Sequence, residues 1–295
     1  MRRPRSSLIA VLAAGALLTA ACAGEETTTG GGGGGGGGQE EVNDFLASIQ
    51  ERGTLRVATD PQYPPQSAFN EETGEWEGFD IDVATEIAER MGVEIEFITP
   101  GWEQIIAGGW QDRWDLSVGS MTVTPERDEV LNFVTPYYYT PAAVAVREED
   151  ADTMTDVATD FDGATIGLCG GCTYEFYLDK TLEIPGEEIE FVIDDAEIRT
   201  YNTDVPAIKD LEVGRLDAAI SSLTTLQGAI DEGSPIAIVG NVFYEPLSAA
   251  VDRSTPLDTT SFVEELDRIV QEMHSDGTLS ALSMEWFGQD LSTKT

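Results

Sequence analysis

Short apolar runs alternate with longer amphipathic segments along most of this chain, from Val42 to its end. The short runs are rich in β-branched residues and are bounded by Gly, Pro or Asp, which is typical of buried strands. The segments between them repeat their apolar residues with helical periodicity. Strands that alternate with helices predict an α/β fold with largely parallel sheets, in which ligands bind beyond the carboxyl ends of the strands.

Nine segments are predicted as strands. They are residues 54–60, 94–100, 115–120, 142–146, 164–168, 188–194, 217–222, 235–240 and 247–251. The clearest helical patterns lie at residues 80–92, 204–214 and 261–277. Asp80 and Asp204 are predicted to cap the first two helices, and Gly92 to end the first. Ser261 and Glu264 form a capping-box pattern at the start of the third.

The first 41 residues are predicted to be a leader and a spacer outside the fold. Residues 1–22 join three arginines to an apolar run too short to span a bilayer core of about 30 Å, and they end at Cys22. This segment is similar to a bacterial lipoprotein signal peptide, in which the Cys becomes the lipidated N-terminus, although Thr19 replaces the usual Leu. Cleavage at another small residue, giving free secretion, is the alternative. Residues 23–41 are Gly-rich and are predicted to be a flexible tether.

Charge and histidine content limit the function. The chain has 55 acidic and 16 basic residues and a net charge of −39, which disfavours nucleic acids and anionic membrane surfaces as partners. A Ser-His-Asp arrangement would have to use the single histidine, His274, which lies near the end of a predicted helix. There is no phosphate loop of the Walker type and no pair of histidines for a metal. No cofactor, metal or catalytic residue is therefore expected.

Two cysteines lie close together in the sequence CGGC. Cys169 and Cys172 can form a small-loop disulfide, which the oxidising surroundings of a secreted chain favour. Free thiols and a redox or metal pair are the alternatives, although two thiols alone do not complete a tetrahedral zinc site.

A single cation, Arg127, follows a strand-like run that is rich in Ser and Thr. Pro125 is predicted to occupy the first turn of a helix and to fix the exit of the chain from the strand. A guanidinium matches a carboxylate with two parallel hydrogen bonds, so this segment can bind the carboxylate of a small solute. An internal bridge from Arg127 to Glu126 or Asp128 is the alternative.

From about Gly53 to Gln289 the chain resembles the bacterial extracellular solute-binding proteins of family 3, the amino-acid-binding receptors of ABC importers. The matching stretches are GTLRVATDPQYPP (53–65), GFDIDVATEIAERMG (78–92), WDLSVGSMTVTPER (114–127), FVTPYY (133–138), GATIGLCGGCTYE (163–175), VGRLDAAIS (213–221) and DGTLSALSMEWFG (276–288). They occur in family order and cover nearly the whole domain. Together they are specific, whereas any one alone is weak.

The resemblance implies a type II periplasmic-binding-protein fold, in which two lobes joined by two hinge strands close on a ligand. Lobe 1 is then expected at residues 53–145 plus 249–291, and lobe 2 at residues 146–248. The hinge candidates are AAVAVRE (142–148) and PLSAAVD (246–252). The ligand is expected in the cleft between the lobes.

The resemblance also implies roles for four polar residues. Arg127 matches the arginine that grips the α-carboxylate of the ligand. Ser120 and Thr122 match strand-end groups that contact its carboxylate or amine. Thr173 matches a residue that donates to the same carboxylate, near a helix N-terminus that favours anions.

Aromatic and acidic residues are implied as the remaining wall of the cleft. Tyr63 matches the aromatic that stacks on the ligand side chain, and Trp102 falls where the family has an apolar or aromatic wall. Asp60 matches a position that faces the positive end of the ligand in cationic-amino-acid receptors. The alternatives are that Asp60 caps a turn, Trp102 packs in the core, and Tyr63 is a surface aromatic.

At position 222 the sequence departs from the family pattern. The family usually has an Asp there that binds the α-ammonium of the ligand, and this chain has Ser222. A hydroxyl does not neutralise a buried ammonium, so either another carboxylate binds it or the ligand is not a standard α-amino acid. Tyr174 stands where a polar residue is common. With Tyr63 and Trp102 it could form an aromatic cage for a quaternary cation, which makes an amino-acid-derived compatible solute an alternative ligand.

The sequence therefore predicts a monomeric, extracytoplasmic, lipid-anchored binding protein. It would carry an amino acid or amino-acid-like carboxylate solute to the membrane permease of an ABC importer. A sensor lipoprotein without a transport role is an alternative. A dehydratase-type enzyme on the same scaffold is another, but the sequence singles out no general acid for it.

Overall fold

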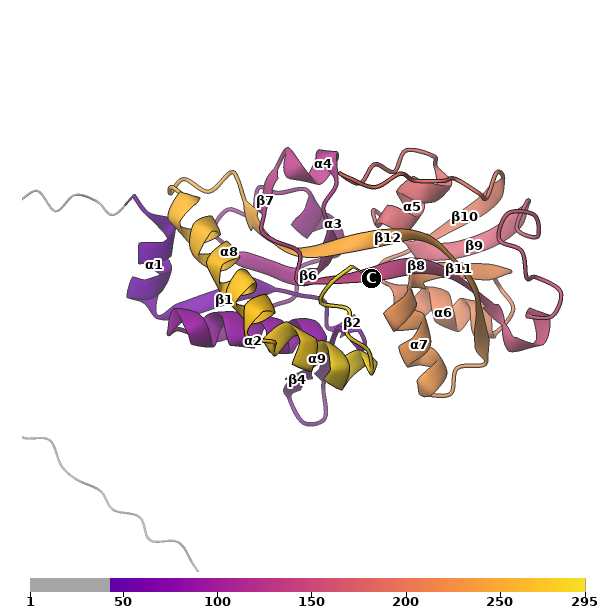
Figure 1. Ribbon diagram of the computed structural model, residues 1–295, viewed down its shortest axis with the longest axis horizontal. Coiled ribbons are helices and arrows are strands. Elements are labelled where there is room, and N and C mark those ends of the chain that lie inside the picture. Colours follow the sequence, from indigo (N-terminus) through magenta and orange to yellow (C-terminus); the bar gives the residue numbers. More distant parts are fainter. Residues whose placement is uncertain (1–42, 295) are drawn as a thin grey trace, which may run out of the picture. The chain divides into compact units, whose positions relative to one another are not determined.

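A mixed β-sheet forms the frame of the protein, and helices pack against it at both of its ends (Figure 1). The computed structural model describes residues 43–294. The strands are β1 (Thr54–Ala58), β2 (Gln62–Tyr63), β3 (Ser67–Asn70), β4 (Glu75–Glu77), β5 (Glu94–Ile98), β6 (Leu116–Thr122), β7 (Leu131–Phe133), β8 (Tyr138–Arg147), β9 (Ala164–Cys169), β10 (Ala196–Tyr201), β11 (Ala218–Ser222) and β12 (Ile236–Asp252). The helices are α1 (Phe45–Arg52), α2 (Phe79–Met91), α3 (Trp102–Ile106), α4 (Pro125–Asp128), α5 (Thr173–Leu178), α6 (Asp204–Glu212), α7 (Leu223–Asp231), α8 (Thr260–Ser275) and α9 (Thr278–Phe287), with a 3₁₀ turn at Glu148–Asp150.

The order of the strands in the large sheet is β10-β9-β11-β8-β12-β6-β1-β5, and β7 pairs with β12. Strand pairs at the two ends are parallel: β1 with β5 and β6, and β9 with β10 and β11. The pairs that involve β8 and β12 in the middle are antiparallel. The prediction of an α/β fold is confirmed, and its parallel strands lie at the ends of the sheet rather than throughout it.

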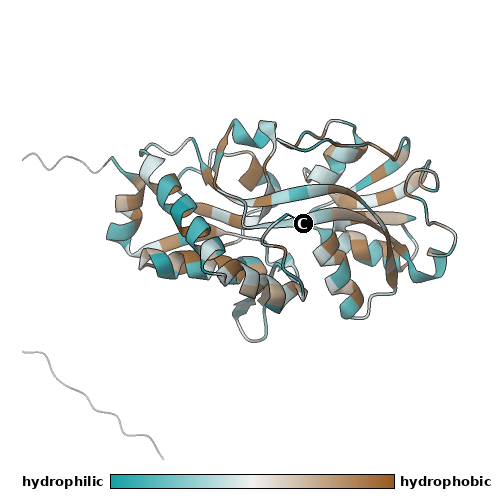
Figure 2. Ribbon diagram, in the orientation of Figure 1, coloured by the Kyte–Doolittle hydropathy of each residue, from teal (hydrophilic) through white to brown (hydrophobic). Residues whose placement is uncertain are grey.

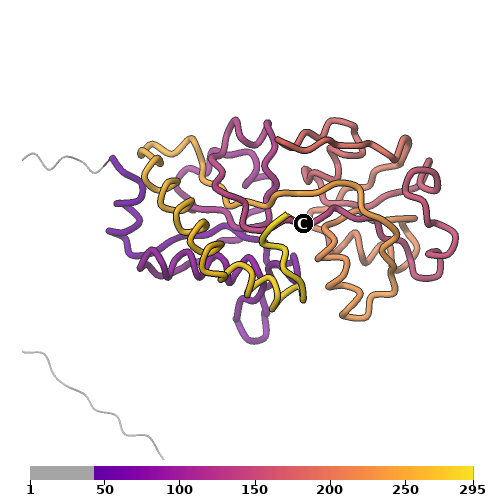
Figure 3. The backbone as a smooth tube through the Cα atoms, in the orientation of Figure 1, coloured from indigo at the N-terminus to yellow at the C-terminus, as the bar shows by residue number. Residues whose placement is uncertain are grey.

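Two neighbouring strands carry the chain between the ends of the sheet. The chain crosses along β8, builds the β9–β11 end with α5, α6 and α7, and returns along β12 (Figure 3). Separate strands were expected at 235–240 and 247–251 because Gly240 and Pro246 suggest breaks. The structure instead has one continuous strand, β12, whose register against β8 shifts at two places and absorbs the irregularity.

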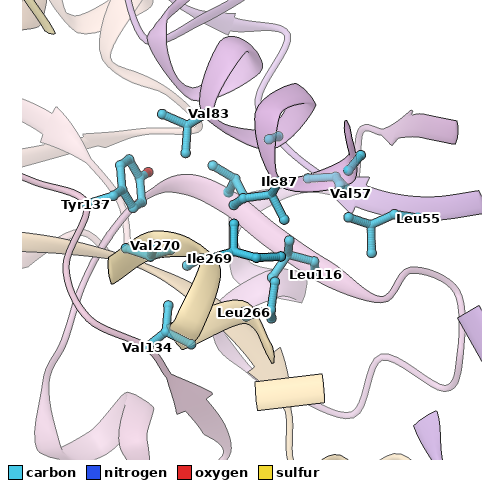
Figure 4. Packing of buried hydrophobic residues seen from close by; sticks show 14 of the residues in the cluster. Leu55, Val57, Val83, Ile87, Leu116, Val134, Tyr137, Leu266, Ile269 and Val270 are labelled. Carbon is cyan, nitrogen blue, oxygen red and sulfur yellow. The ribbon is translucent and has the colours of Figure 1, made fainter. Parts of the chain in front are cut away.

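The first apolar core lies between α2 and α8, with strands β1 and β6 (Figure 4). The inward face of α2 contributes Val83 and Ile87, and that of α8 contributes Leu266, Ile269 and Val270. Burying the apolar area of such side chains stabilises the fold by about 25 cal/mol per Å². Both helices therefore show hydrophobic residues on one side and hydrophilic residues on the other in Figure 2.

The other end of the sheet has its own apolar clusters. Alternate residues of β8 face opposite sides of the sheet, as the pleat requires. Ala142, Val144 and Val146 join one cluster, and Ala143 and Ala145 join the other. This end is thus covered on both faces. The first residue of β8, Tyr138, lies in the core of the other end, so β8 contributes to the cores of both ends.

One predicted strand is wrong. Residues 188–194 contain no strand, and the edge strand of this end is β10 at Ala196–Tyr201. The apolar side chains Ile189, Phe191 and Ile193 favour a strand by composition, but they pack on the core from an irregular segment. The true strand lies at the edge of the sheet, so its residues alternate between half-buried and exposed. Its hydrophobic pattern is therefore weak.

The predicted helix caps differ from the observed ones. Gly78 precedes α2, so Asp80 lies inside the first turn, where it is fully buried. Asp204 is likewise the first residue of α6 rather than its cap. Thr259 precedes α8 without a side-chain cap, and the hydroxyl of Ser261 donates to Asp44 instead. Gly92 does end α2 in the left-handed conformation, as predicted.

The leader and the tether, including Cys22, lie outside the described residues. Among residues 43–294, no helix has the length and hydrophobicity needed to cross a membrane.

Candidate functional site

A small cavity lies where the carboxyl ends of β1, β6, β9 and β10 meet β12. The residues that line it are Asp60, Tyr63, Trp102, Gly119, Ser120, Thr122, Arg127, Cys169, Cys172, Thr173, Tyr174, Asn202, Thr203, Asp204 and Glu245. The structure therefore brings together eight of the nine predicted ligand-contacting residues, with Ser222 as the exception. The parallel strands within each end of the sheet place their carboxyl ends together, and the carboxyl ends of the two sets meet at this cavity.

Arg127 is buried in this cavity, with 4% of its surface exposed. Pro125 occupies the first turn of α4, as predicted, and the Thr124 hydroxyl accepts from the Arg127 backbone N–H. The guanidinium donates to the carbonyl oxygens of Thr122 and Gly171, each over 2.9 Å. Burial lowers the pKa of Arg127 to about 10, which still leaves it charged at neutral pH.

No carboxylate among the described residues forms an ion pair with Arg127. Asp128, one of the two alternatives, pairs with Arg253 instead. The Nε atom of Arg127 is buried and has no hydrogen-bond partner. A buried guanidinium with an unused donor is poised to receive an anionic group.

Trp102 lies against Arg127 and completes one wall. Its ring centroid is 5.2 Å from the guanidinium carbon, a cation–π distance. Its Nε1 donates to the carbonyl oxygen of Gly171 over 3.3 Å, so Trp102 and Arg127 both reach the β9–α5 loop. Gly171 has a φ of +73°, and a Cβ there would lie 3.0 Å from the side chain of Ile106. A glycine is needed for this close approach.

The hydroxyls of Thr122 and Thr173 converge on one carboxylate, that of Glu245. Thr122 Oγ1 donates to Glu245 Oε1 over 2.7 Å, and Thr173 Oγ1 donates to the same oxygen. Glu245 comes from β12 and is 2% exposed. Burial raises its pKa, and the hydroxyl donors and Arg127 oppose that rise. The chain thus places its own carboxylate on the two predicted carboxylate-binding hydroxyls.

Ser120 lines the cavity, but its hydroxyl is engaged elsewhere. It donates to Asp80 over 2.8 Å and accepts from the hydroxyl of Tyr138 over 2.7 Å. The hydroxyl of Tyr137 donates to the same Asp80 and accepts from the backbone N–H of Ser120. Ser120 has a φ of 52°, an uncommon conformation that such surroundings must hold in place. Ser120 therefore lines the cavity with its backbone as much as with its hydroxyl.

Asp60, Tyr63 and Tyr174 line the remaining wall. The carboxylate of Asp60 accepts from the backbone N–H of Gln62 over 2.7 Å, so it caps a turn as well as lining the cavity. Burial raises the pKa of Asp60. Tyr174 is buried beside Phe243, and burial raises its pKa and that of Tyr63. Both phenols are therefore neutral at physiological pH.

Ser222 lies behind the cavity rather than in it. It is 1% exposed and caps α7, where its hydroxyl accepts from the backbone N–H of Thr225 over 3.2 Å. It also accepts from the amide of Gln66 over 3.1 Å and contacts the hydroxyl of Thr224 over 2.9 Å. The Ser222 hydroxyl is thus already used by its own chain.

Asp204 and Glu245 are the acidic residues of the cavity that sequence reasoning missed. Asp204 is 4% exposed, and its Oδ1 has no hydrogen-bond partner. Burial raises the pKa of Asp204 to about 7, the Ser221 hydroxyl opposes the rise, and repulsion from Asp60 and Glu245 adds to it. Placing a strand at 188–194 hid Asp204, because the true strand β10 ends at Tyr201, and Asp204 therefore lies just beyond a carboxyl strand end.

Cys169 and Cys172 are joined as a disulfide in the loop between β9 and α5. Their Cα atoms are 5.5 Å apart, within the usual range for a disulfide. Both line the cavity next to Thr173, the first residue of α5. The closed loop therefore fixes the position at which Thr173 enters the cavity.

The cavity has a volume of about 50 Å³. This is enough for a few water molecules but well below the several hundred Å³ of a typical small-molecule site. A solute of amino-acid size therefore needs more room than this cavity alone provides. Beside the cavity, Arg127 and Trp102 both donate to the carbonyl oxygen of Gly171.

The sequence matches the family model of the bacterial extracellular solute-binding proteins, family 3, over residues 55–289. The chain is similar to the L-cystine-binding protein TcyJ of Escherichia coli strain K12, with 30% identity over 247 residues that cover 83% of this chain and 87% of that protein. It is also similar to the ABC transporter arginine-binding protein 1 of the same strain, with 24% identity covering 83% and 94% of the two chains.

Solved structures share the fold. An ancestral amino acid-binding protein, described as a precursor of cyclohexadienyl dehydratase, superimposes with a TM-score of 0.71 at 28% identity, covering 82% of this chain and 99% of that one. A mutant of ArgBP from T. maritima gives a TM-score of 0.71 at 25% identity, covering 83% and 99%. The curled α/β sheet is therefore that of the type II periplasmic binding proteins.

Proposed function

The chain belongs to the bacterial extracellular solute-binding proteins, family 3, and we propose that it captures an amino acid or amino-acid-like solute for the permease of an ABC importer. The relatives that it matches over most of their length are named as cystine-, octopine- and arginine-binding proteins. The solute binds in the cavity at the carboxyl ends of the strands, where polar and aromatic side chains from both ends of the sheet converge.

One observation carries this proposal: the buried guanidinium of Arg127 has a free Nε donor and no ion-pair partner within residues 43–294. The carboxylate of the solute binds there, and the hydroxyls of Thr122 and Thr173 complete its set of donors. These donors come from different ends of the sheet, so the solute draws the two ends together.

The rest of the cavity selects the solute. Tyr63, Trp102 and Tyr174 pack on its side chain, and Asp60 faces a positive group on that side chain when one is present. Ser120 contacts the solute mainly through its backbone, because its hydroxyl binds Asp80 and Tyr138. Ser222 supports the wall from behind.

Residues 53–145 plus 249–291 act as lobe 1, and residues 146–248 act as lobe 2. The separate apolar clusters at the two ends of the sheet support this division, since each end buries its own core. β8 and β12 are the segments that bend when the lobes open. Cys22 is the lipid attachment site that holds the monomer at the outer face of the cell membrane.

The solute leaves the cavity unchanged. The relatives in the comparisons are binding proteins, although one structural neighbour is a precursor of a dehydratase. Asp204 and Glu245 are buried acids with raised pKa values, which is the kind of group that an acid-catalysed elimination would use. Incubating the protein with its solute and recovering the solute unaltered by NMR tests binding against turnover.

A thermal-shift screen of L-amino acids, polyamines and compatible solutes tests the proposal, because a ligand that binds only the folded state raises Tm. At least one amino acid should raise Tm in a concentration-dependent way. A response to quaternary-ammonium compatible solutes alone would favour the aromatic cage formed by Tyr63, Trp102 and Tyr174. Absence of any response across the panel would contradict the proposal.

A further inference from the structure

The cavity contains a buried carboxylate oxygen that nothing in the described part of the chain satisfies. Asp204 is 4% exposed, lines the cavity, and has an Oδ1 atom without a hydrogen-bond partner. Leaving a buried carboxylate without a donor is costly, and such groups in native proteins have a reason for being there. The Ser221 hydroxyl acts on Asp204 and lowers its pKa, but its oxygen is also buried without a hydrogen-bond partner, so Asp204 Oδ1 can still accept from a group that enters the cavity.

The charges around Asp204 indicate the kind of group that binds it. Within residues 43–294, Asp204 has no ion pair, and Arg127 is the one cation that lines the cavity. The cavity also contains three acidic residues, Asp60, Asp204 and Glu245. Asp60 and Glu245 repel the carboxylate of Asp204. Three carboxylates therefore face one guanidinium, which favours a positively charged group in the cavity, and Asp204 Oδ1 is the acceptor without a partner.

Ser222 does not compete for this role. Its hydroxyl already contacts Gln66, Thr224 and Thr225, and it is absent from the cavity wall. Asp204, in contrast, is the first residue of α6, where the helix dipole favours the ionised carboxylate. In this chain Ser222 ends β11, and the acidic residue Asp204 lies in the cavity beyond the end of β10.

We propose that Asp204 binds the ammonium group of the solute, in place of the side chain at position 222. This inference rests on the proposed function and adds a charge pattern to it: a carboxylate on Arg127 and a protonated amine on Asp204. The ligands are then α-amino acids with a free amine, rather than simple carboxylic acids or solutes that lack an anionic group.

Calorimetry with paired ligands tests this assignment. The probe is whichever L-amino acid raises Tm most among the twenty proteinogenic ones and L-cystine, titrated beside its Nα-acetyl derivative. Asp204→Asn should weaken binding of the free amino acid by roughly 30-fold or more, as expected for losing one partner of a buried charged pair. The Nα-acetyl derivative should bind weakly and equally to both proteins. Asp152→Asn, which removes an exposed charge, should bind like the parent protein.

The outcomes separate this inference from the proposed function. If Arg127→Ala abolishes binding while Asp204→Asn binds the free amino acid within about threefold of the parent, solute binding stands and the role of Asp204 is wrong. If the Nα-acetyl derivative binds the parent protein as tightly as the free amino acid, the role of Asp204 is also wrong. If neither variant weakens binding, or no amino acid in the panel binds, both conclusions are overturned.

A measurement without ligand gives a second readout. An unpaired buried charge destabilises the empty protein, so Asp204→Asn should raise Tm at pH 8, where the parent carboxylate is ionised, and should have less effect at pH 5. If the Asp204 carboxylate instead stabilised the fold, Asp204→Asn would lower Tm at pH 8. A lower Tm of Asp204→Asn at pH 8 would therefore overturn the proposal.

Discussion

The hydroxyl of Thr122 donates to the carboxylate of Glu245 over 2.7 Å, and the hydroxyl of Thr173 donates to the same oxygen. Thr122 ends β6 and Thr173 begins α5, so Glu245 on β12 links groups from both ends of the sheet. A solute carboxylate held by Arg127 reaches these hydroxyls only after Glu245 releases them, because each hydroxyl has a single proton to donate.

The contribution of Glu245 to stability is the first prediction. Glu245→Ala removes the acceptor of two buried hydroxyls and should lower the free energy of unfolding by about 1–3 kcal/mol. Glu245→Gln keeps an acceptor oxygen without the charge and should be less destabilising. Urea unfolding at pH 8 measures both variants. Equal losses in the two variants would show that the charge, rather than the acceptor, is what matters.

Asp80 predicts a pH dependence of stability. Burial raises its pKa to about 7, above the ordinary value of 3.8, while the hydroxyls of Ser120 and Tyr137 oppose the rise. The folded state therefore holds this proton more tightly than the unfolded state. The stabilising contribution is complete below about pH 4 and is lost as the pH rises to about 7, amounting to at most about 4 kcal/mol.

The variant Asp80→Asn tests this dependence. Urea unfolding from pH 4 to pH 8 should show a shallower decline in the free energy of unfolding for Asp80→Asn than for the parent protein. Parallel curves would mean that Asp80 does not titrate in this range.

Gly171 is predicted to be less replaceable than Gly186, another glycine with positive φ. Gly171→Ala adds a Cβ 3.0 Å from Ile106 at a φ of +73°, in the loop whose carbonyl receives Arg127 and Trp102. Gly186→Ala is the matched control, because Gly186 has a φ of +82° and nothing within 4 Å of an added Cβ. The free energy of unfolding of Gly186→Ala should fall by about 1 kcal/mol, because alanine is disfavoured at a positive φ.

In urea unfolding, Gly171→Ala should lower the free energy of unfolding clearly more than Gly186→Ala does. It should also bind the solute differently, because the displaced loop carries Thr173. Identical losses in the two alanine variants would show that the loop moves aside at no cost.

Removing the disulfide should cost a modest amount of stability. Cys169 and Cys172 are three positions apart, and closing so short a loop is expected to contribute about 2 kcal/mol. The double variant Cys169→Ser/Cys172→Ser should therefore unfold at a lower urea concentration than the oxidised parent. Mass spectrometry of the alkylated parent should find no free thiol at either position, and labelling of both would contradict the pairing.

The sequence predicts those parts of the fold in which local pattern and burial agree. The stripes of α2 and α8 repeat at helical spacing because both helices bury one face, and the structure places those residues in the core. The edge strand β10 is missed because its residues are half exposed, whereas the apolar segment 188–194 packs without forming a strand. Long-range packing determines which of these two segments forms the edge strand. A local sequence pattern carries no information about that packing.

The same reasoning applies to the candidate site. Arg127 and its neighbours lie in one continuous motif, so the sequence itself brings them together. Asp204 and Glu245 lie far from it along the chain and reach the cavity only through the sheet order. Ser222 caps α7 through a local contact with Thr225, but its second donor, Gln66, lies 156 positions away and is not indicated by any local pattern.

The affinity of the solute for Arg127→Ala, measured by isothermal titration calorimetry, tests the account most directly. Arg253→Ala is the matched control, because Arg253 is a half-exposed arginine that pairs with Asp128 outside the cavity. Arg127→Ala should lose about 2–5 kcal/mol of binding free energy, and the control should bind like the parent protein. Unchanged affinity of folded Arg127→Ala for the solute would contradict a carboxylate site at this guanidinium.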